Sequence, residues 1–499
     1  MDANRRACLI ALLAAGIAGA QSSAQKHFEQ GLRWLHSFEY DDAREEFVRA
    51  RSADPKFVMA YWGEALSHTE FIWHAQDLNA GRTALARLAA TPAERRKGAR
   101  TERERHYLAA VEALYGSGDY HIRTVAYEEA MRQLVSQHPD DLDGAALYSL
   151  AILGTAHKGR DFTTYMRAAA VAEEVYARDQ KHPGALHYLI HCYDDPVHAP
   201  LGLRAARRYA SVAPDAAHAL HMPSHIFVAM GMWDEVVASN EASWNASVSR
   251  VERKKLQIEE RSYHALYWLE YAYLQQGRYR EAANLLDIVR KDAESSGAAY
   301  LRYHLALMSA AYVLETGEEA KLPPALQVTD IDKAGAAAYL FAKGYLAWQR
   351  GDREATHRAA RNIRTAGNNS RTPSEHTHTA GAPSEEVAAL QLEGLLAGAG
   401  GTSLLEKAAR LEESIPFEFG PPLPPKPVHE LLGEVLLKAG RHKEARAHFA
   451  QALARTPGKS IPLRGLARAA AASGDRQAAR AIYSELRNIR RKADVPWPE

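Results

Sequence analysis

Histidines gather in the middle of this sequence. Seven of its 23 histidines fall between positions 182 and 225: His182, His187, His191, His198, His218, His221 and His225. Two pairs are spaced by four residues, His187–His191 and His221–His225, so each pair places both imidazoles on one face of a helix. Helical zinc sites use this spacing, although a buried imidazole also serves as a polar packing group. The paired histidines therefore have two possible roles, metal ligation and packing in the core.

The interval between the two pairs favours a shared site. Adding 34 to positions 187 and 191 gives 221 and 225, and His157 precedes His191 by the same interval. We therefore predict that the four paired histidines converge on one metal or ligand, with Asp194 or Asp195 as supporting hydrogen-bond acceptors. Imidazoles with a carboxylate suit Zn, Cu, Fe or Ni. No HExxH glutamate is present, because Tyr188 and Met222 follow the first histidine of each pair.

The same interval also organises the rest of the chain. At the C-terminal end, small and aromatic residues fall at offsets 0, 7, 12, 16, 19 and 24: Gly433, Gly440, Ala445, Phe449, Ala452 and Pro457. A second set follows at the same interval: Ala467, Gly474, Ala479 and Tyr483. The N-terminal set reads Gly31, Ala43, Phe47, Ala50 and Pro55, with Phe38 in place of the second glycine. This pattern resembles the tetratricopeptide repeat, a helix-turn-helix unit of ~34 residues.

The resemblance implies an all-α fold, a right-handed α-solenoid with a concave groove lined by the first helix of each repeat. On that pattern His157, His218, Glu430 and Glu434 are expected in the groove as ligand-binding residues. A solvated acidic face is the alternative for the two glutamates. The stretches 187–191, 221–227 and 427–433 are similar to a signature of exported bacterial tetratricopeptide proteins, which implies a shared site without naming an activity.

The first twenty residues resemble a targeting segment. Arg5 and Arg6 precede an apolar run from Ala7 to Ala18, and Ala18-Gly19-Ala20 is typical of a signal-peptide cleavage site. An uncleaved anchor is the alternative. Cleavage removes Cys8 and leaves Cys192 alone, so the mature protein would have no internal disulfide. Cys192 is interpreted as a small buried thiol. We expect a periplasmic or secreted protein without a membrane span once the signal is cleaved.

Composition excludes several classes of protein. The chain has 499 residues, 46% of them hydrophobic, with 62 basic and 61 acidic side chains. Near-neutral charge argues against a nucleic-acid partner. No Walker loop, dinucleotide fingerprint or G-x-S-x-G elbow occurs. We divide the chain into a signal peptide (1–20), a main solenoid (21–420) with a polar insertion near 368–384, and a proline-rich entry with a C-terminal repeat pair (421–499).

Two functions fit these observations. The first is an exported scaffold that binds a peptide, protein or small ligand in a histidine-rich groove, with or without a metal. The alternative is a metal-dependent enzyme, hydrolytic or oxidative, whose active site is that groove. Stacked histidine pairs favour the enzyme, whereas the fold's usual role in docking favours the scaffold. Catalytic residues are not identified by the sequence.

Overall fold

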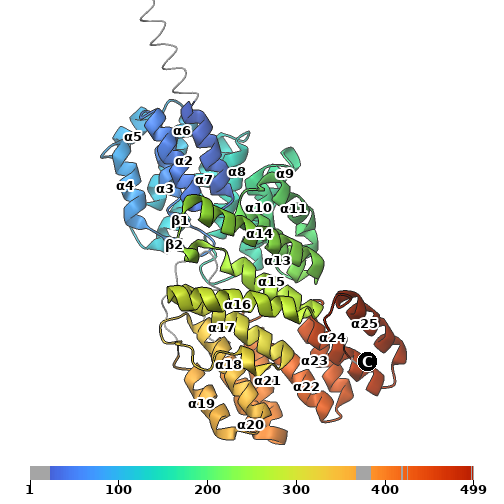
Figure 1. Cartoon of the computed structure of the whole chain (residues 1–499). Helices are drawn as coiled ribbons and strands as arrows, with labels where there is room; N and C mark the ends of the chain where they lie inside the picture. Colours follow the sequence, from blue (N-terminus) through green and yellow to red (C-terminus); the bar gives the residue numbers. More distant parts are fainter. Residues whose placement is uncertain (1–22, 367–383, 417–419, 424, 496, 498–499) are drawn as a thin grey trace, which may run out of the picture. The chain divides into compact units, whose positions relative to one another are not determined.

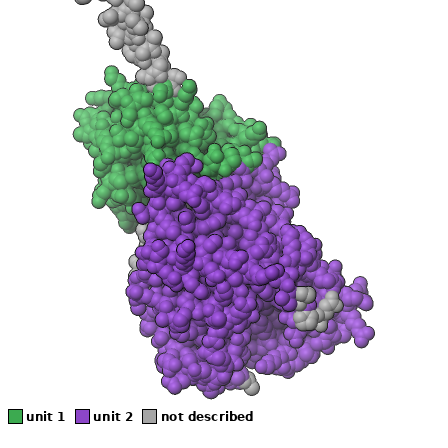
Figure 2. Space-filling view, viewed as in Figure 1, with its two compact units in different colours: residues 1–192, 211–219 green, residues 193–210, 220–499 purple. Residues whose placement is uncertain are grey.

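A computed structural model describes residues 23–366, 384–416, 420–423, 425–495 and 497. The predicted signal peptide and most of the polar insertion lie outside the described residues. The described chain divides into two compact units (Figure 2). Unit 1 comprises residues 1–192 and 211–219, and unit 2 comprises residues 193–210 and 220–499. The predicted boundary near residue 420 lies inside unit 2.

Unit 1 is built from helices and one very short hairpin (Figure 1). Its elements are a helix over 23–36, α2 (Tyr40–Ala53), α3 (Val58–Leu66), β1 (Thr69–Glu70), β2 (Ala75–Gln76), α4 (Leu78–Leu88), α5 (Pro92–Gly98), α6 (Glu102–Leu114), α7 (Tyr120–Gln137), α8 (Leu142–Leu153), α9 (Phe162–Arg178) and α10 (Pro183–Cys192). The two strands pair antiparallel, with Thr69 opposite Gln76. Helices α11 (Ala199–Val212) and α12 (Ala217–His221) follow in the chain.

Unit 2 continues the same organisation. Its remaining elements are α13 (Pro223–Ala229), α14 (Trp233–Lys254), η1 (Ile258–Glu260), α15 (Tyr263–Gln276), α16 (Tyr279–Ser296), α17 (Ala299–Thr316), η2 (Glu319–Lys321), α18 (Lys333–Gln349), α19 (Arg353–Ile363), α20 (Ser384–Ala397), η3 (Gly398–Gly401), α21 (Thr402–Glu413), α22 (Val428–Lys438), α23 (His442–Arg455), α24 (Ser460–Ala472) and α25 (Arg476–Ile489). Consecutive helices pack against each other along both units, as in α14 on α15 and α22 on α23. The prediction of an all-α solenoid of the tetratricopeptide type is confirmed.

The small residues of the repeat are explained by one aromatic ring in each hairpin. The Phe449 ring occupies the space where a Cβ on Gly433 or Gly465 would lie, and the distance from a Cβ on Gly433 would be 2.6 Å. Near the N-terminus the Phe47 ring takes the same place beside Gly31 and Gly63, at 2.8 Å and 2.5 Å. Close approach of helix backbones to a fully buried ring therefore requires glycine at both flanking positions.

Local sequence also sets the helix boundaries around the histidines. Pro223 starts α13, because proline lacks an N–H and its fixed φ suits the first turn of a helix. His221 consequently ends α12, as the position of Pro223 predicts. Asp195 precedes α11, and its carboxylate accepts the backbone N–H groups of Val197 and His198 at 2.9 Å and 3.0 Å.

Candidate functional site

Unit 2 contains a cluster of three buried histidines, His221, His225 and His264, which we call the unit 2 cluster. They come from the end of α12, from α13 and from the first turn of α15. The Nε2 atoms of His221 and His225 are 3.0 Å apart. One nitrogen of each of the three imidazoles lies within 4.8 Å of the others, a spacing suited to a shared metal ion. All three side chains are at most 1% exposed.

The opposite ring nitrogens of two of these histidines are held by acceptors. His221 Nδ1 lies 2.6 Å from Asn240 Oδ1, and the Asn240 amide nitrogen donates to the Val236 carbonyl at 2.8 Å. That second bond fixes the amide with its oxygen toward His221. His225 Nδ1 lies 2.5 Å from Asp194 Oδ2, and the Asp194 side chain is also 1% exposed. Both imidazoles therefore carry a proton on Nδ1, and their Nε2 atoms face each other.

The charge state of these imidazoles makes the arrangement informative. Burial lowers the pKa of His221 to about 4, although the hydrogen bond to Asn240 offsets part of that effect. A neutral His221 presents a lone pair to the His225 Nε2 at 3.0 Å. Either the His225 Nε2 carries a proton that it donates to the His221 lone pair, or a cation lies between the two nitrogens. Nitrogen ligands of a tetrahedral ion with ~2.0–2.1 Å bonds are about 3.3–3.4 Å apart, so a shift of a few tenths of an ångström would fit the pair to a metal.

The indole ring of Trp268 packs against the same imidazoles and fixes their orientation. The Trp268 ring stacks on His225 with centroids 4.5 Å apart and meets His221 edge-on at 4.8 Å. Gly420 lies against Trp268 so closely that a Cβ at this position would overlap the indole. His264 and Trp268 share one face of α15, four residues apart.

Unit 1 contains a second cluster, formed by His187, His191 and His218, which we call the unit 1 cluster. His187 Nε2 lies 3.1 Å from both His191 Nε2 and His218 Nε2. His187 Nδ1 donates to the backbone carbonyl of His36 at 2.6 Å, which leaves the Nε2 lone pair facing the other two rings. Burial lowers the pKa of His187 to about 3, so this imidazole is neutral at pH 7.

A third group, formed by the buried His36 and His182 and the partly exposed Asp143, is arranged differently, because its imidazoles face a carboxylate. Both imidazoles place Nε2 on the Asp143 carboxylate, at 3.0 Å and 3.2 Å. Their Nδ1 atoms accept hydrogen bonds from the Tyr188 hydroxyl and the Ala185 N–H. Burial alone would raise the pKa of Asp143, but the hydrogen bonds from His182 and His36 hold it below its usual value. Hydrogen bonds therefore satisfy this group without an ion.

The remaining predicted histidine lies elsewhere. His157 Nδ1 is 3.2 Å from His74 Nδ1, and its Nε2 is 3.0 Å from the Thr124 hydroxyl. His121 meets the same ring edge-on at 4.1 Å. His218, which the repeat pattern assigns to a ligand groove, is a buried member of the unit 1 cluster, and its role in binding a ligand stays a prediction. Burial raises the pKa of the Cys192 thiol to about 12, in agreement with a small buried thiol.

The two predicted groove glutamates belong to an ion-pair network in unit 2. Glu430 is 1% exposed and lies 3.0 Å from Lys426 and 2.7 Å from Lys459. Lys426 also contacts Glu434 at 2.9 Å, and Lys459 contacts Glu315 at 2.9 Å. Burial would raise the pKa of Glu430, but the two ammonium groups outweigh it and lower that pKa. A solvated acidic face is therefore wrong for Glu430, and its role in binding a ligand stays a prediction.

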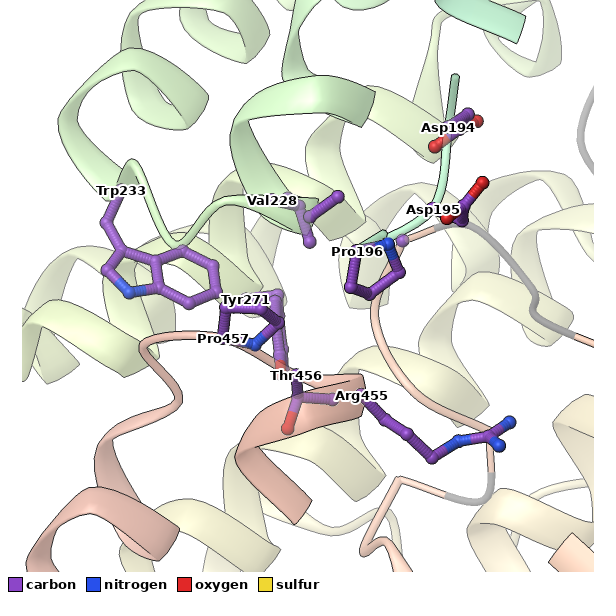
Figure 3. A pocket seen from close by; sticks show the side chains of 11 residues that line it. Asp194, Asp195, Pro196, Val228, Trp233, Tyr271, Arg455, Thr456 and Pro457 are labelled. Atoms are coloured by element: carbon purple, nitrogen blue, oxygen red, sulfur yellow. The ribbon is translucent and has the colours of Figure 1, made fainter. Parts of the chain in front are cut away.

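A pocket in unit 2 reaches the unit 2 cluster through Asp194 (Figure 3). It is an open hollow of about 370 Å³ that includes solvent at its mouth, and its enclosed part has room for little more than a water molecule. Trp233, Tyr271 and Pro457 face Asp195 and Pro196 across it, and Arg455 lies at its lower edge in Figure 3. The carboxylate that holds His225 thus also borders this pocket.

Sequence reasoning missed His264 and Asn240. His264 does not lie one repeat length after His225, and it has no histidine four residues away, so neither the repeat interval nor the pair spacing identifies it. Asn240 lies in α14 with no histidine or cysteine beside it in the sequence, so no motif marks it. Asp194 was identified as a supporting acceptor, and this is confirmed for His225. The convergence of the two histidine pairs on one site stays a prediction.

Comparison with known proteins identifies one segment of the chain. Residues 436–495 match the family model described as tetratricopeptide repeat. That segment holds α23, α24 and α25, where the glycine and phenylalanine ladder is most regular. No curated protein is matched by the chain.

Solved helical-repeat structures show only a coarse likeness. Yeast Tom70 is 11% identical, with 91% of this chain and 96% of that chain covered and a TM-score of 0.33. Human IFIT1, solved as a dimer with PPP-AAAA, is 12% identical, with 95% of both chains covered and a TM-score of 0.35. The TPR domain of P58(IPK) is 11% identical, with 91% and 99% covered and a TM-score of 0.20. Structures with TM-scores this low give no information about the function of this chain.

The described residues, which omit 1–22, 367–383, 417–419, 424, 496 and 498–499, contain no candidate membrane span. None of the helices in that part of the chain combines the length and the apolar character needed to cross a bilayer.

Proposed function

We propose that this protein is an exported helical-repeat scaffold that holds a transition-metal ion in the unit 2 cluster and binds a ligand beside it. One observation carries the metal assignment. His221 and His225 are held by acceptors on Nδ1, and their Nε2 atoms face each other at 3.0 Å in a buried space with His264. A carboxylate behind a metal-bound histidine is a recurring arrangement, because it fixes the tautomer and increases the basicity of the ligand.

The donor set defines the class of metal. Three imidazoles suit Zn, Cu, Fe and Ni better than Ca or Mg, which prefer oxygen ligands. The negative charge of Asp194 lies one ring away and offsets part of the charge of a divalent ion. Zn²⁺ is the natural first probe, since it takes tetrahedral nitrogen sites readily.

Export and ligand binding rest on separate observations. The basic, apolar and small-residue order of residues 5–20 supports export. The pocket bordered by Asp194, Tyr271 and Arg455 supports binding of a small ligand or a peptide side chain near the metal. Asp194 would couple the two events, because it contacts His225 and lines the pocket.

The metal-dependent enzyme remains the second candidate, and the ligand count favours it. Catalytic zinc sites commonly use three protein ligands and keep a position for water or substrate. The unit 2 cluster supplies three imidazoles next to a pocket. A hydrolytic or oxidative reaction would then take place at the ion.

Metal analysis followed by an activity screen separates these functions. The natural protein should be purified without chelators, and its metal content and N-terminus determined. Bound metal that is lost in His225→Ala, together with an N-terminus near Gln21, supports the exported metal-binding protein. A metal-free natural protein that takes up no Zn²⁺ contradicts it. Turnover of a hydrolytic or oxidative substrate that disappears with the metal favours the enzyme over the scaffold.

A further inference from the structure

Phe38 occupies a backbone conformation that an aromatic residue rarely adopts. Its φ is +56°, in the left-handed region, where a bulky side chain is strained. The corresponding turn position in the C-terminal repeats is glycine, with φ of +74° at Gly440 and +86° at Gly474. A left-handed conformation is unfavourable for a non-glycine residue, because its Cβ comes too close to the following carbonyl oxygen. The backbone at Phe38 is therefore strained, at a position where the repeat pattern has glycine.

The Phe38 side chain lies against all three histidines of the unit 1 cluster. Its ring centroid is 4.3 Å from that of His187, 5.6 Å from that of His191 and 5.5 Å from that of His218. The Trp73 ring meets Phe38 edge-on at 5.4 Å and His218 at 6.0 Å. Phe38 is fully buried, and its ring gives the three imidazoles an apolar surface to pack against. Strained residues of this kind concentrate at functional sites.

The nitrogen geometry of this cluster matches that of a ligand set. His187 Nε2 lies 3.1 Å from both His191 Nε2 and His218 Nε2, and its proton is held on Nδ1 by the His36 carbonyl. The other buried histidine group of unit 1 differs, because its Nε2 atoms meet the Asp143 carboxylate and need no ion.

We propose that His187, His191 and His218 form a second transition-metal site, and that Phe38 is its positioning residue. This site is additional to the metal proposed for the unit 2 cluster. Each histidine pair of the sequence is then completed by its own third imidazole, His218 for one pair and His264 for the other. Two ions per chain replace the single ion that the sequence pattern predicts.

Zn²⁺ titration of the metal-free full chain tests this proposal. We expect two equivalents for the unaltered protein, one for His218→Ala, one for His264→Ala and none for the double variant. His218→Gln and His264→Gln repeat the test with larger side chains if an alanine variant fails to fold. His182→Gln is the matched control, since it alters a buried histidine of the hydrogen-bonded group and should retain both equivalents.

Other stoichiometries distinguish this proposal from the proposed function. If the unaltered protein binds one equivalent of Zn²⁺, and this equivalent is lost in His264→Ala but kept in His218→Ala, the second site is overturned and the unit 2 metal stays supported. If the unaltered protein binds one equivalent and each of the two variants loses it, the histidines share one site, and the proposal of a second site is overturned. One equivalent lost only in His218→Ala supports the second site and overturns the unit 2 metal. No binding overturns both.

A further variant tests the role of Phe38. Phe38→Gly relieves the backbone strain but removes the ring, so Zn²⁺ affinity at the unit 1 cluster should fall about 10–100-fold, as for other residues that orient metal ligands. Affinity at the unit 2 cluster should stay unchanged. Phe38→Leu keeps an apolar side chain and should give an intermediate loss. Unchanged affinity in both folded variants overturns the positioning role.

Discussion

His225 and Asp194 form a buried pair in unit 2, with Nδ1 and Oδ2 separated by 2.5 Å and both side chains 1% exposed. The pair fixes the tautomer of His225 and aims its Nε2 at His221. Asp194 also lines the pocket of Figure 3, so one carboxylate serves the histidine cluster and the ligand space.

Asp194→Asn should weaken metal binding without removing the ligands. The amide keeps the size of the side chain but loses the negative charge that supports His225, so we expect Zn²⁺ affinity at the unit 2 cluster to fall about 10–100-fold. Titration calorimetry measures this loss. Asp195→Asn is the matched control, because Asp195 contacts His198 and the start of α11 and should leave the affinity unchanged. Equal affinities for the two variants would contradict a supporting role for Asp194.

Glu412 should make stability depend on pH near neutrality. Burial raises its pKa to about 7 from 4.5, while the hydrogen bond from the Val428 N–H offsets part of the shift. Below pH 4.5 the side chain is protonated in both the folded and the unfolded chain. As the pH rises toward 7, only the unfolded chain releases the proton, so stability is lost over this range. Above pH 7 the loss is complete.

Glu412→Gln should remove that dependence. At pH 8 the variant should be more stable than the unaltered protein by up to about 3 kcal/mol, because each unit of pKa shift is worth about 1.4 kcal/mol. Below pH 4.5 the two should be equally stable. Chemical denaturation at several pH values measures the difference, with the exposed Glu406→Gln as control. If the difference in stability between the variant and the unaltered protein does not vary with pH, the raised pKa of Glu412 is contradicted.

Lys459→Met should destabilise unit 2 strongly. Lys459 is 1% exposed and pairs with both Glu315 and Glu430. Its removal takes the ammonium partner from the buried Glu315 and leaves Glu430 with Lys426. Breaking a buried ion pair from one side costs about 3–5 kcal/mol. Denaturant unfolding measures the change against the exposed Lys438→Met. Similar stability of the two variants would show that the network contributes little.

Gly465→Ala should destabilise the C-terminal repeats. The added methyl would overlap the buried Phe449 ring, and overpacking of this kind costs about 1–3 kcal/mol. At Gly440 an added methyl meets nothing within 4 Å, so Gly440→Ala should cost only the left-handed backbone penalty. Combining Gly465→Ala with Phe449→Leu should recover part of the loss at Gly465, which thermal unfolding can test. No recovery would indicate that the ring is not the cause.

The repeat pattern was predictable because its physical cause is local. Phe449 follows Gly433 within one hairpin, and the same offset joins Gly31 to Phe47, so the sequence repeats what the packing requires. Pro223 likewise marks the start of α13 by its own geometry.

The complete histidine clusters were not predictable in the same way. His218 falls short of one repeat length after His187, and His264 falls beyond one repeat length after His225. Their positions depend on how α12 and α15 pack, which is a tertiary property. The strain at Phe38 was visible in sequence only as an aromatic residue at a glycine position.

Anomalous diffraction from a crystal of the zinc-loaded protein tests the central claim most directly. At the zinc absorption edge we expect a peak ~2.0–2.1 Å from the Nε2 atoms of His221 and His225 and from one ring nitrogen of His264. The peak should be absent in crystals of His225→Ala prepared in the same way. Zinc peaks found only on exposed side chains, with the unit 2 cluster empty, would contradict the account.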